Sequence, residues 1–462
     1  MRLAVLSNVP RLMVLFFLLL VGYLAGISLF GWLVLDMPLS HIEVVQFLEQ
    51  ASLVFLLLPY VLILSPIVLF AMVRLVVTQP TLQYDPHKPL PFFTIIIPAY
   101  NEEKVIANSV RTMLQQDYPA HSFKVVVAFN GNDRSGEIAQ QLGATVYTTP
   151  QVGVGKRNAI SYVLKHLPVQ AQGSYILILD ADNLVKKDFL QQMAAVICQP
   201  HAVLAVQGNH QPLVVSKNWV SRGLSAAYRA SSLLYNEGRS LSCQSALLCG
   251  TGFAIREDVF RDLWPKTKTL TEDIELNGLL LQHYNSGVVW ANQAVFYDEK
   301  PDNLSIAIRQ RTRWMAGHFW CGLLYAAGLI GRGIWQRDLR RIELGSYYLF
   351  PFALLSSVLL LALVAVQQCC LANTELVSHP WQLAWSGALL LFYLFYIVLG
   401  DAMTPQAEPK TGWQRLIDAA CGALFALLVW PVAIIRACFM LQRKDWIFHT
   451  PHKSNGHEQS LS

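Results

Sequence analysis

Two aspartates separated by one residue follow an apolar run in the middle of the chain. Asp180 and Asp182 come directly after Tyr175–Leu179, which has the composition of a buried strand. Paired carboxylates at a strand end are hard oxygen ligands that suit Mg²⁺ or Mn²⁺ bridging a diphosphate. Such an ion stabilises the charge that develops on a departing phosphate group. The pair is therefore a candidate metal site, although a solvated turn after a strand has the same pattern.

Two further motifs lie downstream, and each has an ordinary explanation of its own. Thr271, Glu272 and Asp273 open an amphipathic helix expected at 274–283, where acids in the first turn cap the helix and complement its dipole. The sequence Gln-Arg-Thr-Arg-Trp at 310–314 also matches a basic amphipathic stretch beside a membrane. Taken singly, neither motif indicates chemistry, so their meaning depends on the elements around them.

The elements that would hold these motifs form an alternating pattern between about residues 89 and 313. Short β-branched runs alternate with amphipathic stretches, as in a parallel sheet flanked by helices. The predicted strands are 93–97, 123–129, 144–148 and 174–179, and the predicted helices are 103–116, 135–142 and 156–166. In such sheets ligands bind beyond the carboxyl ends of the strands. The residues expected there are Tyr100, Asn101, Glu102, Asn130, Asp133, Asp180 and Asp182. The sequence therefore predicts an α/β nucleotide-binding domain.

Two other phosphate-binding architectures are excluded by missing motifs. A dinucleotide-binding domain needs G-x-G-x-x-G after its first strand, but residues 98–103 read Pro-Ala-Tyr-Asn-Glu-Glu. The glycine-rich stretch at 153–157 is not a Walker loop, because that loop needs Gly where Pro150 stands and Ser or Thr at Arg157.

Five motifs in a fixed order resemble those of a known family. They are Pro98-Ala99-Tyr100-Asn101-Glu102, Gly155-Lys156-Arg157-Asn158-Ala159, Asp180-Ala181-Asp182, Thr271-Glu272-Asp273, and Gln310 followed by Arg313-Trp314. Over about 93–314 the chain resembles the family 2 glycosyltransferases of the GT-A fold. It is similar in particular to the membrane-embedded synthases related to cellulose, chitin, hyaluronan and poly-N-acetylglucosamine synthases. The resemblance implies an α/β GT-A domain with a Rossmann-like mixed sheet, combined with α-helical transmembrane segments.

The resemblance also implies a role for each motif. Asp180 and Asp182 would bind the ribose and the metal-bound diphosphate of the donor, and Asp273 would be the general base for the acceptor hydroxyl. Such a base needs hydrogen-bond reach and partial desolvation. Glu272 and Arg313 are expected beside it as further catalytic residues, with Arg313 stabilising the diphosphate. The other donor residues expected are Tyr100, Asn101, Glu102, Asp133 and Lys156, and the acceptor residues are Gln310, Trp314, Gly250, Thr251 and Gly252.

One residue departs from the family's pattern. The family often has an aspartate after the second strand that reads uracil, whereas Phe129 stands at that place here. Asp133, later in the same loop, is the residue that would compensate, so a UDP-sugar is the expected donor and another nucleotide-sugar stays open as the alternative. The tail at 446–450 is similar to the W-x-x-x-T element that closes over the active site in relatives, and an ordinary interfacial tryptophan is the alternative.

The composition indicates a membrane protein. Hydrophobic residues make up 54% of the 462 residues and charged residues 14%, which is unusual for a soluble protein. Five uncharged apolar runs account for the excess, at 12–35, 51–73, 344–366, 381–400 and 419–435. A crossing helix needs about 20 residues, so four runs are long enough and the fifth is marginal. The first run also exceeds an ordinary signal-peptide core.

Basic residues place the middle of the chain in the cytoplasm. The loop between the first two runs has no Lys or Arg. Arg2 and Arg74 instead flank the outer ends of this pair of runs, which satisfies the positive-inside rule. A basic cluster at 332–341 before the third run agrees with this orientation. Three more crossings would place Arg436 and Arg443 outside, so one C-terminal run is expected to lie along the interface or to re-enter.

The expected organisation has five parts. They are two transmembrane helices at 1–78, a cytoplasmic catalytic domain at 89–314, interfacial helices at 315–343, two or three membrane helices at 344–440 and a cytoplasmic tail at 441–462. The net charge of +5, with basic residues beside membrane segments, favours membrane lipids over nucleic acid as partners. Eight cysteines without a C-x-x-C pair indicate neither a disulfide framework nor a zinc site.

The resemblance implies an inverting hexosyltransferase that uses a nucleotide-sugar and Mg²⁺ or Mn²⁺ in a multi-pass, inner-membrane protein. Its expected product is an exopolysaccharide or other cell-surface polysaccharide, with polysaccharide-export accessory proteins as partners. Single-sugar transfer to a lipid acceptor, such as a glycolipid or polyprenyl-linked sugar, stays open as an alternative. A catalytically inactive accessory subunit is the third possibility, and the intact acids Asp180, Asp182 and Asp273 argue against it.

Overall fold

The computed structural model describes residues 65–355, 358, 380–405 and 410–440, apart from 79, 86, 88, 171, 201 and 214–217. The first predicted membrane run and the tail at 446–450 lie outside the described residues. The second and third runs lie partly outside them.

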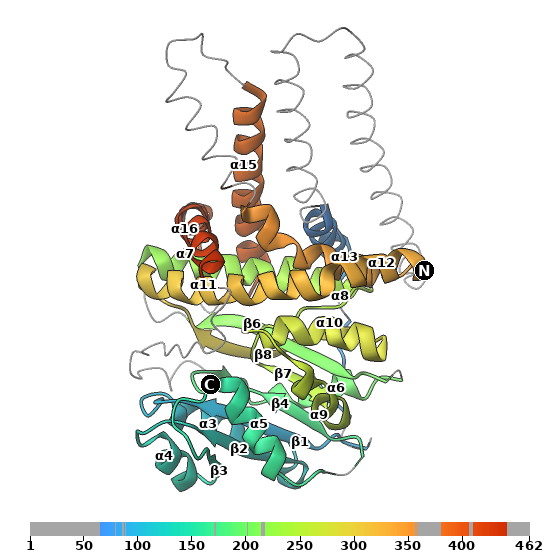
Figure 1. Cartoon of the computed structure of the whole chain (residues 1–462), viewed down its shortest axis with the longest axis vertical. Helices are drawn as coiled ribbons and strands as arrows, with labels where there is room; N and C mark the ends of the chain where they lie inside the picture. The colour runs from blue at the N-terminus through green and yellow to red at the C-terminus, as the bar shows by residue number, and fades with distance from the viewer. Residues whose placement is uncertain are drawn as a thin grey trace.

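An eight-stranded mixed sheet forms the centre of the described chain (Figure 1), with the order β3-β2-β1-β4-β7-β6-β8-β5. The strands are β1 (Phe93–Ala99), β2 (Phe123–Phe129), β3 (Thr145–Thr148), β4 (Tyr175–Ile178), β5 (Leu184–Val185), β6 (Ala205–Leu213), β7 (Phe253–Arg256) and β8 (Val288–Glu299). The first four strands pair in parallel, as predicted. β7 runs antiparallel to both β4 and β6, which makes the whole sheet mixed.

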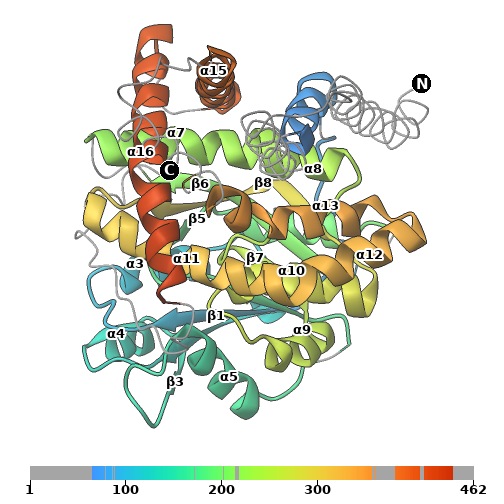
Figure 2. The same cartoon turned by 45° about the horizontal axis from the view of Figure 1, so that its top comes forward.

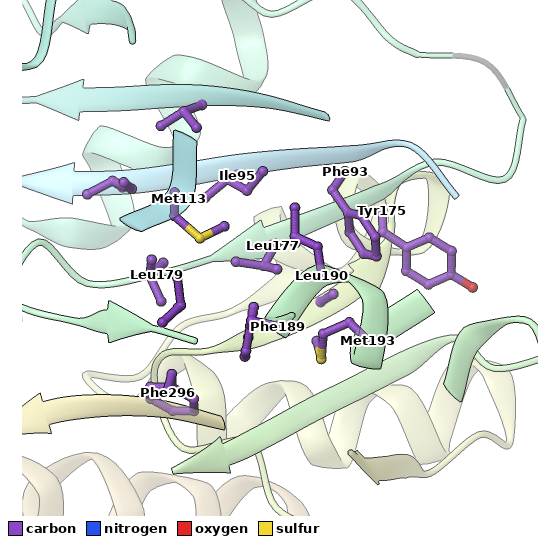
Figure 3. Packing of buried hydrophobic residues seen from close by; sticks show 14 of the residues in the cluster. Phe93, Ile95, Met113, Tyr175, Leu177, Leu179, Phe189, Leu190, Met193 and Phe296 are labelled. Carbon is purple, nitrogen blue, oxygen red and sulfur yellow. The ribbon is translucent and has the colours of Figure 1, made fainter. Parts of the chain in front are cut away.

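Side chains alternate between the two faces of the sheet, and helices cover each face. On β1, Phe93 and Ile95 belong to one hydrophobic cluster and Ile96 to the other, as the period of two requires. The first face packs on α3 (Ile106–Leu114), α4 (Ser135–Gln141) and α6 (Phe189–Ile197), as Figure 3 shows in part. The second face packs on α5 (Lys156–His166), α9 (Glu257–Leu263) and α10 (Glu272–Tyr284). Each fully buried Ile or Phe contributes roughly 1.5–3 kcal/mol, so this alternation fixes the strand register.

A layer of helices separates the sheet from the apolar helices (Figure 1). Its members are α7 (Trp219–Ala230), the π-helix η2 (Ser231–Glu237), α8 (Gly238–Leu241), α11 (Leu304–Cys321), the π-helix η4 (Gly322–Ala326), α12 (Ala327–Gln336) and α13 (Leu339–Tyr348). On the far side lie the helix Ser65–Val76, α15 (Pro380–Met403) and α16 (Gly412–Cys438). The described residues also include two short 3₁₀ turns, η1 (Ala120–Ser122) and η3 (Trp264–Lys266). α11 continues without a break across the domain boundary predicted at 314.

Among the described residues, one helix, α16, is long and apolar enough to cross a membrane by length and composition. The helix Ser65–Val76 and the segment Leu390–Met403 of α15 are apolar but shorter. The run at 419–435, marginal by its own length, lies within the longer helix α16, which begins at Gly412 behind a capping box formed by Thr411. α16 lies across α7 and α11 (Figure 2). The other predicted crossings stay predictions.

α7, η2 and α8 form one continuous helical rod. It contacts the helix Ser65–Val76, α15 and α16, each through an ion pair and a small residue. At each crossing a charged residue of the rod pairs with a charge on the apolar helix, and the next rod residue is small. The ion pairs are Arg222–Asp418 (2.7 Å), Arg229–Asp401 (2.5 Å) and Glu237–Arg74 (3.0 Å). The small residues are Gly223, Ala230 and Gly238, which lie against the backbone of Gly422, Gly400 and Phe70. Two α-helical turns span about 7.2 residues, and the wider π turn η2 absorbs the extra residue in the second interval.

We expect Asp401→Asn to lower the unfolding temperature of the detergent-solubilised protein. Asp401 is fully buried and lies 2.5 Å from Arg229, with Lys410 at 3.5 Å and Arg415 at 3.8 Å. Removing its charge leaves Arg229 and Arg415 without this carboxylate, while Lys410 keeps Asp418 at 2.7 Å, and the loss costs about 3 kcal/mol. The control Asp258→Asn breaks an exposed ion pair at the start of α9 and should cost less than about 1 kcal/mol. Equal shifts for the two variants would contradict the expectation.

Candidate active site

Asp180, at the carboxyl end of β4, is tied to two other loops. Its backbone N–H donates to Thr251 Oγ1 at 2.8 Å, and Lys156 Nζ donates to its Oδ1 at 2.6 Å. The same ammonium donates to the carbonyl of Gly250 at 2.7 Å. Burial alone would lower the pKa of Lys156, but Asp180 and the two acids of α10 raise it above its usual value. Lys156 therefore holds a positive charge beside the aspartate.

Asp182 lies in the turn between β4 and β5. Asn183 Nδ2 donates to Asp182 Oδ1 at 3.0 Å, and Asn183 in turn accepts from the Thr251 hydroxyl. Nowhere in the described part of the chain do three or more His, Cys, Asp or Glu side chains group as a complete metal site. An ion that bridges a diphosphate needs only one or two protein carboxylates, because phosphate oxygens and water fill the other positions. The donor set of Asp180 and Asp182 fits that requirement.

The carboxylate of Asp273 lies over the turn that Lys156 holds. Gly250 has a φ of +81°, and a Cβ there would lie 3.3 Å from Asp273 Oδ2. A glycine at this position therefore provides both the backbone conformation and the room for the carboxylate. Burial, and then the charge of Glu272, raises the pKa of Asp273 to about 6, while Lys156 and Arg313 act in the opposite direction. A carboxylate with a pKa near the working pH is suited to general base catalysis.

Two contacts fix the start of α10, which presents Asp273. Asn277 Nδ2 donates to the Asp273 carbonyl at 2.8 Å, and Asn277 Oδ1 accepts from the Leu248 N–H at 3.2 Å. α11 lies directly against the same turn, because a Cβ at Gly317 would be 2.8 Å from the backbone nitrogen of Thr271. Only glycine at 317 allows this approach of the two backbones.

α11 also brings the predicted acceptor motif to this end of the sheet. Arg313 Nη1 donates to the Leu270 carbonyl at 3.3 Å, and its charge acts on Asp273. Gln310 and Trp314 are joined through a residue that the sequence did not single out. Arg311 donates to Gln310 Oε1 at 2.7 Å, and its guanidinium carbon lies 4.0 Å from the Trp314 ring centre.

The loops after β1 and β2 form one hydrogen-bonded unit. Asn101 has a φ of +58°, and its side chain accepts from the Asn132 N–H at 2.9 Å. Asp133 accepts from the N–H groups of Glu103 and Ser135, at 2.9 Å and 3.0 Å. Asp133 therefore holds the two loops together, a structural role that the sequence did not predict. Its expected contact with the nucleobase stays a prediction.

Phe129 ends β2 and packs partly buried against the core of the first sheet face. A Cβ at Gly131 or Gly136 would come within 3.0 Å of its ring, so the two glycines make room for the aromatic side chain. An apolar ring cannot accept a hydrogen bond from uracil. Recognition of a uracil base would therefore need other groups of this loop.

The structure brings many of the predicted site residues together and gives one of them, Gly252, a packing role. Lys156, Asp180, Gly250, Thr251 and Asp273 are linked by direct contacts, with Arg313 and Glu272 acting by charge. Tyr100, Asn101, Glu102 and Asp133 lie in the loops after β1 and β2, and Gly252 packs beneath the Phe296 ring. Sequence reasoning missed Asn183, Arg311 and Gly317. A lone glycine inside a helical pattern was the available signal for Gly317.

Comparison with known proteins identifies the middle of the chain. Residues 89–317 match the family described as glycosyltransferase like family 2. The probable glycosyltransferase YdaM of Bacillus subtilis is 27% identical over 252 residues, which cover 52% of this chain and 58% of that protein. The beta-monoglucosyldiacylglycerol synthase of Synechocystis is 26% identical over 385 residues, which cover 78% of this chain and 74% of the synthase. The chain thus spans only part of the length of each relative.

A solved structure shares the fold. The mannosyltransferase PcManGT of Pyrobaculum calidifontis, solved in complex with GDP-Man and Mn²⁺, aligns with a TM-score of 0.50 at 18% sequence identity. The alignment covers 82% of this chain and 99% of that one. The mixed sheet and the acids at its edge define a GT-A-like glycosyltransferase domain. Residues 89–317 thus match a glycosyltransferase family 2 domain, and the relatives that the chain resembles are named as glycosyltransferases or synthases.

Sugar transfer is expected to fall as the pH drops through about 6, because Asp273 must be ionised to accept a proton. kcat/KM should decrease about tenfold per pH unit below that value and level off above about pH 7. Glu272→Gln removes a charge that raises the pKa of Asp273, so the acid limb should move to lower pH. The pH profiles of the two proteins test this, and an acid limb that stays in place would contradict the assignment of Asp273.

Proposed function

We propose that this protein is a glycosyltransferase that moves one sugar from a UDP-sugar to a lipid acceptor at the cytoplasmic face of the inner membrane, with inversion at the anomeric carbon. The observation that carries the proposal is the place of Asp273. Its partly buried carboxylate, with a pKa of about 6, lies over Gly250, and Lys156 and Asp180 meet at the same turn. A base and a diphosphate site on adjoining sides of one turn suit a single displacement.

In this reaction Asp273 takes the proton of the acceptor hydroxyl while the hydroxyl oxygen bonds to the anomeric carbon. The bond from that carbon to the nucleoside diphosphate breaks at the same step, so the configuration inverts. Lys156, which donates to Asp180, and Arg313, whose charge reaches Asp273, supply positive charge around the leaving diphosphate. Removing one preorganised group of this kind typically costs about 10²–10³ in rate.

Asp180 and Asp182 would hold a divalent cation at the diphosphate. When bound, Mg²⁺ or Mn²⁺ neutralises the charge of the leaving group. Thr251 accepts from the backbone N–H of Asp180, and Asn183, which accepts from the Thr251 hydroxyl, donates to the carboxylate of Asp182. This second layer of contacts keeps both acids at the end of β4.

A lipid acceptor is favoured by how far the similarity extends. The match to the Synechocystis beta-monoglucosyldiacylglycerol synthase covers 78% of the chain, well beyond the catalytic domain. α12 and the end of α16 also expose large apolar side chains, with Trp335 at 88% and Phe439 at 85% exposure. Such side chains suit contact with acyl chains, and they support the multi-pass membrane location expected from the five apolar runs.

Polysaccharide synthesis is the second candidate, and the motif Gln310, Arg313 and Trp314 favours it. A half-buried tryptophan that follows Arg313, whose charge acts on Asp273, suits stacking on a sugar ring of a growing glycan. Export accessory proteins would then be partners. Both candidates use the same donor site and the same base.

Product analysis with purified protein in lipid nanodiscs tests the proposal. UDP- and GDP-sugars would be supplied with Mg²⁺ or Mn²⁺, with and without diacylglycerol, and products identified by mass spectrometry. Nucleotide release coupled to a monoglycosylated lipid is the expected result, and a UDP-sugar should serve best. A long glycan formed without added lipid would favour the second candidate. No transfer from any donor would overturn both.

A further inference from the structure

Arg311 is a buried cation without a carboxylate partner among the described residues. It lies in the middle of α11, and only 2% of the residue is exposed to solvent. Its hydrogen bonds go to two neutral groups, the Gln310 amide oxygen at 2.7 Å and the Tyr228 hydroxyl at 3.3 Å. Its buried Nε has no hydrogen-bond partner. Burying a charge in this way costs stability, so the fold alone gives no reason for arginine here.

Aromatic rings from three helices surround the Arg311 guanidinium. Trp314, on its own helix, lies 4.0 Å from the guanidinium carbon. Tyr228 of α7 lies 5.8 Å away, and Phe425 and Trp430 of α16 lie at 5.8 Å and 5.7 Å. Cation–π contacts of this kind are each worth about 0.5–2 kcal/mol, with the stronger values in desolvated sites. The short distance to Trp314 makes this ring the principal contact.

Tyr228 connects the same cluster to the sheet. Lys300, which follows β8, places its ammonium 3.4 Å from the Tyr228 ring centre and pairs with Asp298 at the end of that strand. The Tyr228 hydroxyl accepts from Arg311. The guanidinium is therefore held relative to the sheet edge by Tyr228 and relative to α16 by two rings. Arg311 therefore has little freedom to move, and the Trp314 ring that stacks on it is restrained as well.

We infer that Arg311 is a positioning residue of the acceptor subsite, which fixes the Trp314 ring so that its other face is offered to the acceptor. The inference rests on the proposed function, in which Trp314 contacts the acceptor. Without the stacked guanidinium, the half-buried indole regains rotamer freedom that acceptor binding must then remove. Ordering one such side chain is worth about a tenfold change in affinity.

Arg311→Met tests the inference, because methionine has a similar length but neither charge nor a planar head. We expect its unfolding temperature to stay close to that of the wild type, since the cost of burying a cation without a carboxylate and the cation–π contacts are removed together. The KM for the acceptor should rise about tenfold, while the KM for the nucleotide-sugar changes less than about twofold. Arg311→Lys, which keeps the charge but not the plane, should show a similar acceptor defect. Arg309→Met changes an exposed arginine of the same helix and serves as the matched control.

A double-mutant cycle separates positioning from a merely structural role. If Arg311 acts through Trp314, then Arg311→Met should add almost nothing to the acceptor defect of Trp314→Ala. Fully additive defects, or a wild-type acceptor KM in stably folded Arg311→Met, would overturn the inference. If Arg311→Met does not fold, Arg311→Lys decides in the same cycle. Absence of transfer by the wild-type protein would instead count against the proposed function.

Discussion

Asp273→Asn is expected to reduce turnover by about 10²–10⁴-fold while the protein still binds its nucleotide-sugar. Asparagine keeps the shape of the side chain at the start of α10, and the Asn277 contact involves only the backbone carbonyl. The amide cannot accept the acceptor's proton. The measurements are the steady-state rate with saturating substrates and the affinity for the nucleoside diphosphate from equilibrium binding.

The chain offers a matched control for this variant at the start of another helix. α9 begins with Glu257 and Asp258, as α10 begins with Glu272 and Asp273, but Asp258 is exposed and paired with Arg256. Asp258→Asn should keep the rate within about twofold, as surface substitutions usually do. A rate for Asp273→Asn close to that of the control would rule out Asp273 as the base. Lost diphosphate affinity would point to a structural defect instead.

The sequence predicted those strands whose residue composition alone favours a strand. β1, β2, β3 and β4 agree within two residues with the runs at 93–97, 123–129, 144–148 and 174–179, because each is a continuous β-branched or apolar segment. β6 and β8 were not predicted. β6 contains Gly208, Asn209 and Pro212, and these residues are tolerated because its pairing with β8 and α7 supplies the order that its local sequence lacks.

The candidate site was predictable where a residue is recognised by its type and place in a motif. Asp180, Lys156 and Asp273 are such residues, and the structure joins them at the Gly250 turn. Arg311 could not be found in this way. Its role depends on rings of α7 and α16, which lie about 80 to 120 residues away along the chain, and only tertiary packing brings them to it.

Gly317→Ala is expected to lower activity by about 10²-fold while the protein remains folded. A Cβ at 317 would lie 2.7 Å from Thr271 Cγ2 and 2.8 Å from the Thr271 nitrogen, so flexible side-chain motion cannot relieve the clash. α11 must therefore move away from the turn that presents Asp273. A displacement of about 1 Å at a reacting group costs rates of this size. The turnover of the purified variant in nanodiscs measures the effect.

Gly328→Ala provides the comparison, because a Cβ at that position of α12 meets no atom within 4 Å. Alanine is favoured over glycine inside a helix by about 1 kcal/mol, so this variant should keep the wild-type rate and melt at the same or a higher temperature. Gly317→Ala gains the same helix propensity, and any difference in activity between the two variants therefore arises from the contact with Thr271. Equal activity would mean that α11 can shift without disturbing Asp273. The close backbone approach would then serve stability alone.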